Sequence, residues 1–108
     1  MMDGNPTVYG ETAFFTAASD QEMIPAKGVG ICSVLDMWTC VNRDTVPITF
    51  ILKDGTTQKA HLQVPANDSR AAFFPSGLVG SANTAWNVAI NMVAGTSCVA
   101  YAGGKLTA

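Results

Sequence analysis

Residues 46–65, VPITFILKDGTTQKAHLQVP, decide the fold class of this chain. Apolar side chains occupy every second position from 48 to 52 and again from 60 to 64, with mostly polar side chains between them. A period of two is typical of a strand with one buried face, whereas a helix would require apolar spacings of three and four. Asp54 and Gly55 lie between the two runs, where a tight turn is needed. The stretch therefore predicts an antiparallel hairpin with one face in the core and the other largely in water.

Further short strands are predicted toward the C-terminus. Residues 84–92 alternate between large apolar side chains, beginning with Trp86, and small or polar ones. Residues 96–102 follow a glycine and are expected to close a second hairpin with them. Residues 71–74 are typical of a short strand that ends at Pro75 and is followed by a loop rich in glycine and serine.

The N-terminal half has a less regular pattern. Residues 7–17 and 21–24 indicate short strands separated by a turn. Residues 31–41 form a longer apolar stretch that Asp36 interrupts, and both faces of an extended chain would carry large apolar groups there. Two interpretations stay open for this stretch: a strand buried on both faces, or a strand that contains a bulge.

These patterns predict an all-β fold. Seven to eight short strands with no convincing helix indicate an antiparallel β-sandwich or a jelly-roll-like barrel. A length of 108 residues favours one domain over residues 1–108. Residues 1–10 are polar and include a proline, which makes them a candidate for an extended N-terminal arm that reaches a neighbouring molecule.

Composition excludes several classes of protein. Hydrophobic residues make up 48% of the chain and charged residues 13%, against about 25% in an average globular protein, so general disorder is excluded. The net charge is −2 and neither sign clusters, which argues against nucleic-acid and membrane partners. The chain begins without a secretory pattern and has no apolar run near 20 residues, so we expect it to be made in a cytoplasm.

The three cysteines, Cys32, Cys40 and Cys98, cannot all pair within one chain. On one strand, Cys32 and Cys40 would lie about 26 Å apart, far beyond the reach of a disulfide. The favoured interpretation is three reduced thiols that act as small apolar side chains. The alternative is one cross-strand disulfide that involves Cys98.

No residue pattern indicates catalysis. His61 falls on the predicted wet face of the hairpin, and a base there would need a cysteine nucleophile and a carboxylate within hydrogen-bond distance. Asp36 is an isolated acid that we expect to face solvent or to lie at a bulge. The sequence has no closely spaced metal-ligand pairs and no phosphate-binding glycine motif in a strand-to-helix setting. We therefore predict no catalytic, cofactor-binding or metal-binding residues and no cofactor.

Aromatic side chains are the best candidates for an interaction surface. In an extended strand one ring of each adjacent pair, Phe14-Phe15 and Phe73-Phe74, must point away from the core. Exposed rings on a thin sandwich mark partner surfaces more often than catalytic pockets. The candidate interface residues are Tyr9, Phe14, Trp38, Phe73 and Tyr101. An alternative use of Trp38 and Tyr101 is stacking on sugar rings, as in a carbohydrate-binding module.

The running order of strands and turns resembles the small β-sandwich virion proteins of tailed bacteriophages. The resemblance lies in LKDGTT at residues 52–57, VPAN at 64–67, a short phenylalanine-containing strand, Leu78, and ANTAWNVA at 82–89. These elements cover less than half of the chain, and they are strand and turn signals that carry no chemical signature. The stretch 31–41 has no counterpart in the resemblance.

The resemblance implies a structural role without enzymatic activity. The chain is similar to proteins that decorate or cement the capsid by bridging major capsid subunits. This resemblance implies that the major capsid protein is a partner, and that the chain forms a homo-oligomer, either a dimer or a trimer. It also implies a place on the capsid surface of a virion after synthesis in the host cytoplasm. Two alternatives stay open: a tail or fibre component of the virion, and the carbohydrate-binding module.

Overall fold

The computed structural model describes residues 7–13, 15, 19–91 and 98–107, and these residues form eight strands and no helix. The strands are β1 (Thr7–Glu11), β2 (Gln21–Ile24), β3 (Cys32–Asn42), β4 (Ile48–Asp54), β5 (Thr57–Val64), β6 (Asp68–Val79), β7 (Trp86–Ile90) and β8 (Val99–Thr107).

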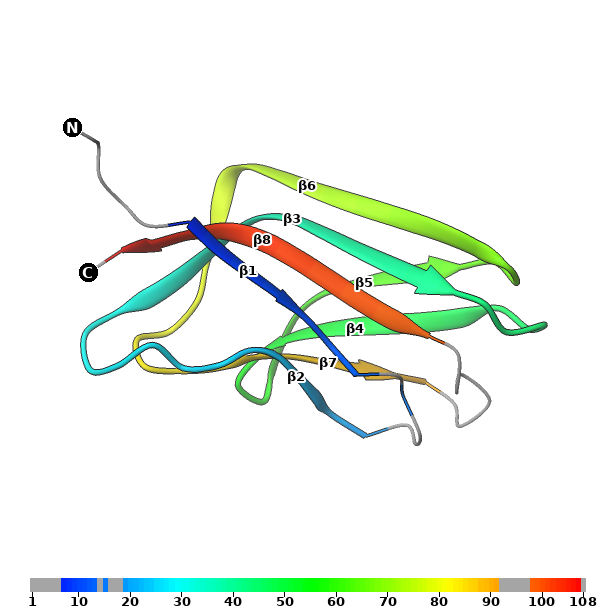
Figure 1. Cartoon of the computed structure of the whole chain (residues 1–108), viewed down its shortest axis with the longest axis horizontal. Helices are drawn as coiled ribbons and strands as arrows, with labels where there is room; N and C mark the ends of the chain where they lie inside the picture. Colours follow the sequence, from blue (N-terminus) through cyan, green and yellow to red (C-terminus); the bar gives the residue numbers. More distant parts are fainter. Residues whose placement is uncertain (1–6, 14, 16–18, 92–97, 108) are drawn as a thin grey trace.

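The eight strands pack as two four-stranded antiparallel sheets (Figure 1). Sheet A has the order β1-β8-β3-β6, and sheet B has the order β2-β7-β4-β5. Apart from the β4–β5 hairpin, every step along the chain crosses from one sheet to the other. This is the strand order of an eight-stranded jelly roll, so the predicted all-β antiparallel sandwich of jelly-roll type is confirmed.

The hairpin predicted from residues 46–65 is confirmed in detail. β4 and β5 pair from Ile48 with Val64 to Asp54 with Thr57. Alternate residues of β4 are fully buried, as expected for a strand with one face in the core. Gly55 in the turn has a φ of 63°, a left-handed conformation that glycine adopts without steric cost.

The predicted second hairpin, between residues 84–92 and 96–102, is wrong. β7 pairs with β4 and β2 in sheet B, whereas β8 pairs with β3 and β1 in sheet A. β8 also continues through Gly103 and Gly104 to Thr107, beyond the predicted end. Local alternation identified the two strands, but it holds no information about which sheet each one joins.

The expected end of a strand at Pro75 is also wrong. β6 runs through Pro75 to Val79, and it pairs with β3 alone at the edge of sheet A. Pro75 lies among residues 74–77 of this edge strand, for which the register with β3 gives no partner, so its missing N–H costs no ladder hydrogen bond.

The stretch 31–41 contains the bulge that the sequence left open. The pairing of β3 with both neighbours shifts between Leu35 and Met37, and Asp36 is exposed at that point. Leu35 and Trp38, an odd and an even position, are therefore both completely buried. The bulge explains why large apolar groups occupy both parities in this stretch.

The core lies between the two sheets. The rings of Phe15 and Phe50 meet edge to face with centroids 6.1 Å apart. The indole N–H of Trp86, in sheet B, donates to the carbonyl oxygen of Ser33 in sheet A at 3.0 Å. This buried hydrogen bond joins the two layers and fixes the position of a large core side chain.

The candidate N-terminal arm overlaps the first strand. Thr7 to Gly10 belong to β1, which pairs with β8, so they form one edge of sheet A. Residues 1–6 lie outside the described residues, and the arm remains an expectation for them.

Candidate interaction surface

The outer faces of the two sheets differ in chemistry. On sheet B, Lys53 forms an ion pair with Asp20 at 3.0 Å, and His61 and Asn87 lie on the neighbouring strands. The outer face of sheet A instead carries aromatic and aliphatic side chains. Because a strand presents alternate residues to each side, the pairing registers show which residues share this face.

One row of paired residues crosses the whole outer face of sheet A. Tyr9 on β1 pairs with Gly103 on β8, Gly103 pairs with Met37 on β3, and Met37 pairs with Phe73 on β6. The rings at its two ends are exposed, Tyr9 by 63% and Phe73 by 71%. A Cβ on Gly103 would lie 3.5 Å from Cγ of Met37, so the Met37 side chain lies beside this glycine. We call these four residues the central row.

Two further rows flank the central row. On one side are Glu11, Tyr101, Thr39 and Ala71, and on the other are Thr7, Lys105, Val34 and Val79. Val79 is 57% exposed. Lys105 and the bulge residue Asp36 are both exposed, and neither forms an ion pair within the described residues. The outer face of sheet A is thus an apolar surface with few charges, of a kind that marks contacts with other proteins.

The predicted interface residues have different positions in the structure. Tyr9 and Phe73 are exposed and Tyr101 is half-buried, and all three lie on the outer face of sheet A. The prediction of Trp38 as an interface residue is wrong. Trp38 is completely buried, because the bulge turns its side chain into the core. Phe14 lies outside the described residues.

Sequence reasoning missed the other members of this face. Met37 was not predicted to lie on this face because the bulge changes which side of β3 each residue faces. Gly103 was not predicted because two successive glycines are typical of a loop. The carbohydrate-binding alternative needs an exposed Trp38, so the sugar platform formed by Trp38 and Tyr101 does not exist in this fold.

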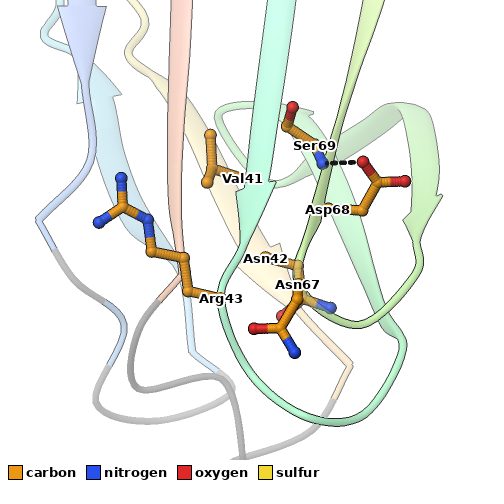
Figure 2. Close-up of a pocket in the computed structure, with 6 residues that line it drawn as sticks. All are labelled: Val41, Asn42, Arg43, Asn67, Asp68 and Ser69. Carbon is orange, nitrogen blue, oxygen red and sulfur yellow. Dashed lines mark hydrogen bonds between the residues drawn. The ribbon is translucent and has the colours of Figure 1, made fainter.

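A shallow hollow of about 270 Å³ lies at the end of the sandwich where β3 ends and β6 begins (Figure 2). Its lining includes Asn42, Arg43 and Asp68. Figure 2 shows the side chains of Arg43 and Asp68 on opposite sides of the hollow, and the Asp68 carboxylate accepts a hydrogen bond from the Ser69 N–H at 2.8 Å. Ligand pockets gather convergent polar groups, which this hollow does not.

The buried side-chain amide of Asn42, beneath the hollow, forms hydrogen bonds that connect four segments of the chain. Its Nδ2 donates to the carbonyl oxygens of Val46, Val64 and Pro65 at 2.8, 3.1 and 3.1 Å. Its Oδ1 accepts from the backbone N–H of Asp44 and from the thiol of Cys98. All polar atoms of this side chain are occupied, so Asn42 is a structural residue.

All three cysteines are free thiols, which agrees with the favoured sequence interpretation and not with the disulfide alternative. Cys40 and Cys98 are completely buried and Cys32 is half-buried. Burial raises the pKa of the Cys40 thiol far above its usual value, and a charge on Cys98 would raise it further. Burial also raises the pKa of Cys98. Neither thiol is an activated nucleophile.

The histidine lies apart from the cysteines. His61 is exposed and pairs with Ile51 on the outer side of sheet B, whereas Cys40 and Cys98 lie inside the core and Cys32 belongs to sheet A. These residues therefore do not form a nucleophile and base pair. Asp36 is exposed at the bulge, as expected.

Two kinds of feature are absent from the described residues. Within them, no three side chains of the metal-ligating types lie close enough together to hold an ion. The same residues include no helix with the length and apolar character needed to cross a bilayer.

Comparison with solved structures shows the same fold in viral shells. A protein of the virus-like particle of the giant freshwater prawn Macrobrachium rosenbergii extra small virus is similar over 98% of this chain and 80% of its own, with a TM-score of 0.53 and 10% identity. The coat protein of Tobacco streak virus is similar over 97% of this chain and 88% of its own, with a TM-score of 0.52 and 13% identity. No family model and no curated protein sequence matches the chain.

Proposed function

We propose that this chain is a non-enzymatic structural protein of a virus particle, which decorates or cements the capsid by bridging major capsid subunits. The observation that carries the proposal is the jelly-roll strand order, which is similar over nearly the whole chain to proteins of two viral shells. The likeness in fold supports a place in a virion, and the resemblance of residues 52–89 to small phage virion proteins supports the decorating role.

The surface chemistry is consistent with assembly. One outer face is polar and suited to water, while the other exposes Tyr9, Phe73 and Val79 on a protein with few charged residues. An apolar face of this kind favours burial against another subunit. In a symmetric shell each weak contact is repeated many times, so modest individual affinities give stable attachment.

Cryo-electron microscopy and quantitative mass spectrometry of purified virions from the source of this gene test the proposal. We expect the chain at regular lattice sites on the outer shell, in a copy number comparable to that of the major capsid protein. Absence from purified particles would refute a virion role. A handful of copies confined to the tail would instead identify a tail or fibre component.

A control distinguishes decoration from shell formation. We expect the purified chain alone to form small oligomers and to bind preassembled capsids that lack it. Closed shells formed by the chain alone would identify it as the coat subunit and would contradict the decorating role.

A further inference from the structure

We propose that the outer face of sheet A is a homodimer interface, in which two copies are related by a two-fold axis that runs parallel to the strands between β8 and β3. The inference concerns the partner of this surface and holds whether or not the chain belongs to a virion.

The first argument is the symmetry of the central row. The row runs Tyr9, Gly103, Met37, Phe73 across β1, β8, β3 and β6. A two-fold axis between the two middle strands places β1 opposite β6 of the partner subunit, and β8 opposite β3 of the partner subunit. Tyr9 then faces Phe73 of the partner subunit, and this contact occurs twice. An isologous interface needs a self-complementary surface of this type.

The shape of the row suits such a contact. The exposed rings stand at the two ends, and the middle is low because Gly103 has no side chain and Met37 lies beside it. Met37 thus lies close to the axis, where it meets Met37 of the partner subunit. A flexible thioether fills an irregular gap well, and two facing aromatic rings favour offset stacking.

Charge is the second argument, and it is independent of the apolar row. Asp36 lies on β3, between the central row and the neighbouring row that contains Lys105. Lys105 itself lies on β8. The same axis exchanges these two strands, so it places Asp36 opposite Lys105 of the partner subunit. Both side chains are exposed, and within the described residues neither has an ion-pair partner in its own chain. Glu11 lies on the edge strand β1, at the rim, where a charge can remain in water.

The area is near the lower end for a specific dimer. The strands of sheet A have 5, 9, 11 and 12 residues, and at about 3.3 Å per residue and about 4.8 Å between strands they present a face of roughly 600 Å². A standard protein interface buries about 800 Å² on each partner. Sheets that pack face to face align to within about 30°, which agrees with an axis parallel to the strands.

Sedimentation equilibrium and light scattering of the full chain test the interface. We expect a dimer with a dissociation constant of about micromolar or tighter. Phe73→Lys is expected to weaken the dimer by at least about tenfold, because it replaces the ring that faces Tyr9 of the partner subunit with a charge. The matched control is Ile51→Lys in the outer face of sheet B, which is expected to change the constant by less than about twofold.

A charge-reversal cycle gives the decisive measurement. Asp36→Lys and Lys105→Asp are each expected to weaken the dimer about tenfold, because each sets like charges opposite one another. The double variant restores the opposite-charge pair and is expected to return within about threefold of the unchanged chain. Both residues are exposed, so the variants should fold, and circular dichroism checks this.

Three outcomes would overturn the proposal. They are a monomer at all concentrations, a trimer, or a dimer that neither Phe73→Lys nor the two single charge variants weaken. Two single variants that weaken the dimer without rescue by the double variant would overturn the position of the axis.

Discussion

Gly104 of β8 lies against the carbonyl oxygen of Val34 in β3, so closely that a Cβ on Gly104 would overlap this atom. The same Cβ would also lie 2.9 Å from Cα of Leu35. These contacts occur where β3 bulges at Asp36, so the bulge and the glycine depend on one another.

We predict that Gly104→Ala destabilises the fold by about 3 kcal/mol or more, because rigid backbone atoms must move to admit the methyl group. Gly103→Ala is the matched control on the same strand. Its Cβ would meet the Met37 side chain at 3.5 Å and the carbonyl oxygen of Val8 at 3.8 Å, both ordinary contact distances, so we expect a change within about 1 kcal/mol. Urea unfolding at one protein concentration measures both free energies of unfolding. Equal effects of the two substitutions would contradict the role of the bulge.

Asn42 is expected to be the most important polar side chain of the core. Asn42→Ala removes the donor to the buried carbonyl oxygen of Val64 and the acceptor for the Cys98 thiol. A buried polar group without a partner costs about 1–3 kcal/mol, so we predict a loss of about 2–4 kcal/mol in the free energy of unfolding. Asn91→Ala is the control, since the exposed Asn91 accepts one hydrogen bond from Thr49, and its loss should cost less than about 1 kcal/mol. Similar losses in the two variants would show that the buried network is unimportant.

Two aspartates allow a comparison of buried and exposed carboxylates. The Asp54 carboxylate, 7% exposed, accepts from the backbone N–H of Ser81 at 3.0 Å and from its hydroxyl at 2.7 Å. This pair fixes the connection between β6 and β7 to the β4–β5 turn, and we predict that Asp54→Ala costs about 2–3 kcal/mol. Asp20→Ala breaks only the exposed ion pair with Lys53 and should cost about 0–1 kcal/mol. Thermal unfolding at constant ionic strength checks the order, and a larger loss for Asp20→Ala would contradict it.

The local elements of this fold follow from the sequence because their causes are local. Period-two alternation and the Asp54-Gly55 turn predict the β4–β5 hairpin, and β2 matches its predicted bounds. The pairing of β7 and β8 was mispredicted because strand alternation identifies a buried face and not the sheet that buries it. The strand through Pro75 was missed because tolerance of proline depends on an edge position, which is a property of the assembled sheet.

The candidate interaction surface was predictable only in part. Tyr9, Phe73 and Tyr101 were selected by chemistry, and the fold places all three on one face. Trp38 was selected wrongly because one bulged residue, Asp36, inverts the side on which every later side chain of β3 lies. A one-residue change of register has this effect in any strand, and no local pattern in residues 31–41 shows it.

The buried thiols predict a loss of stability at alkaline pH. Because burial raises the pKa of Cys40 and Cys98 in the folded state, an unfolded chain releases both protons at lower pH than the folded chain does. Their contribution to stability is therefore fully present below the unfolded pKa of about 8.5 and is lost as the pH rises toward the folded values. Above about pH 9 we expect the free energy of unfolding to fall by about 1.4 kcal/mol per pH unit for each thiol.

Urea unfolding at a series of pH values from about 7 to about 10, on either side of the unfolded cysteine pKa, measures this slope. The double variant Cys40→Ala and Cys98→Ala is expected to show a shallower decline than the unchanged chain, because it lacks both buried thiols. Cys32→Ala is the matched control: Cys32 is half-buried on the same strand as Cys40, and we expect this variant to keep the full slope. An unchanged slope in the double variant would show that Cys40 and Cys98 ionise without unfolding, and would contradict their complete burial.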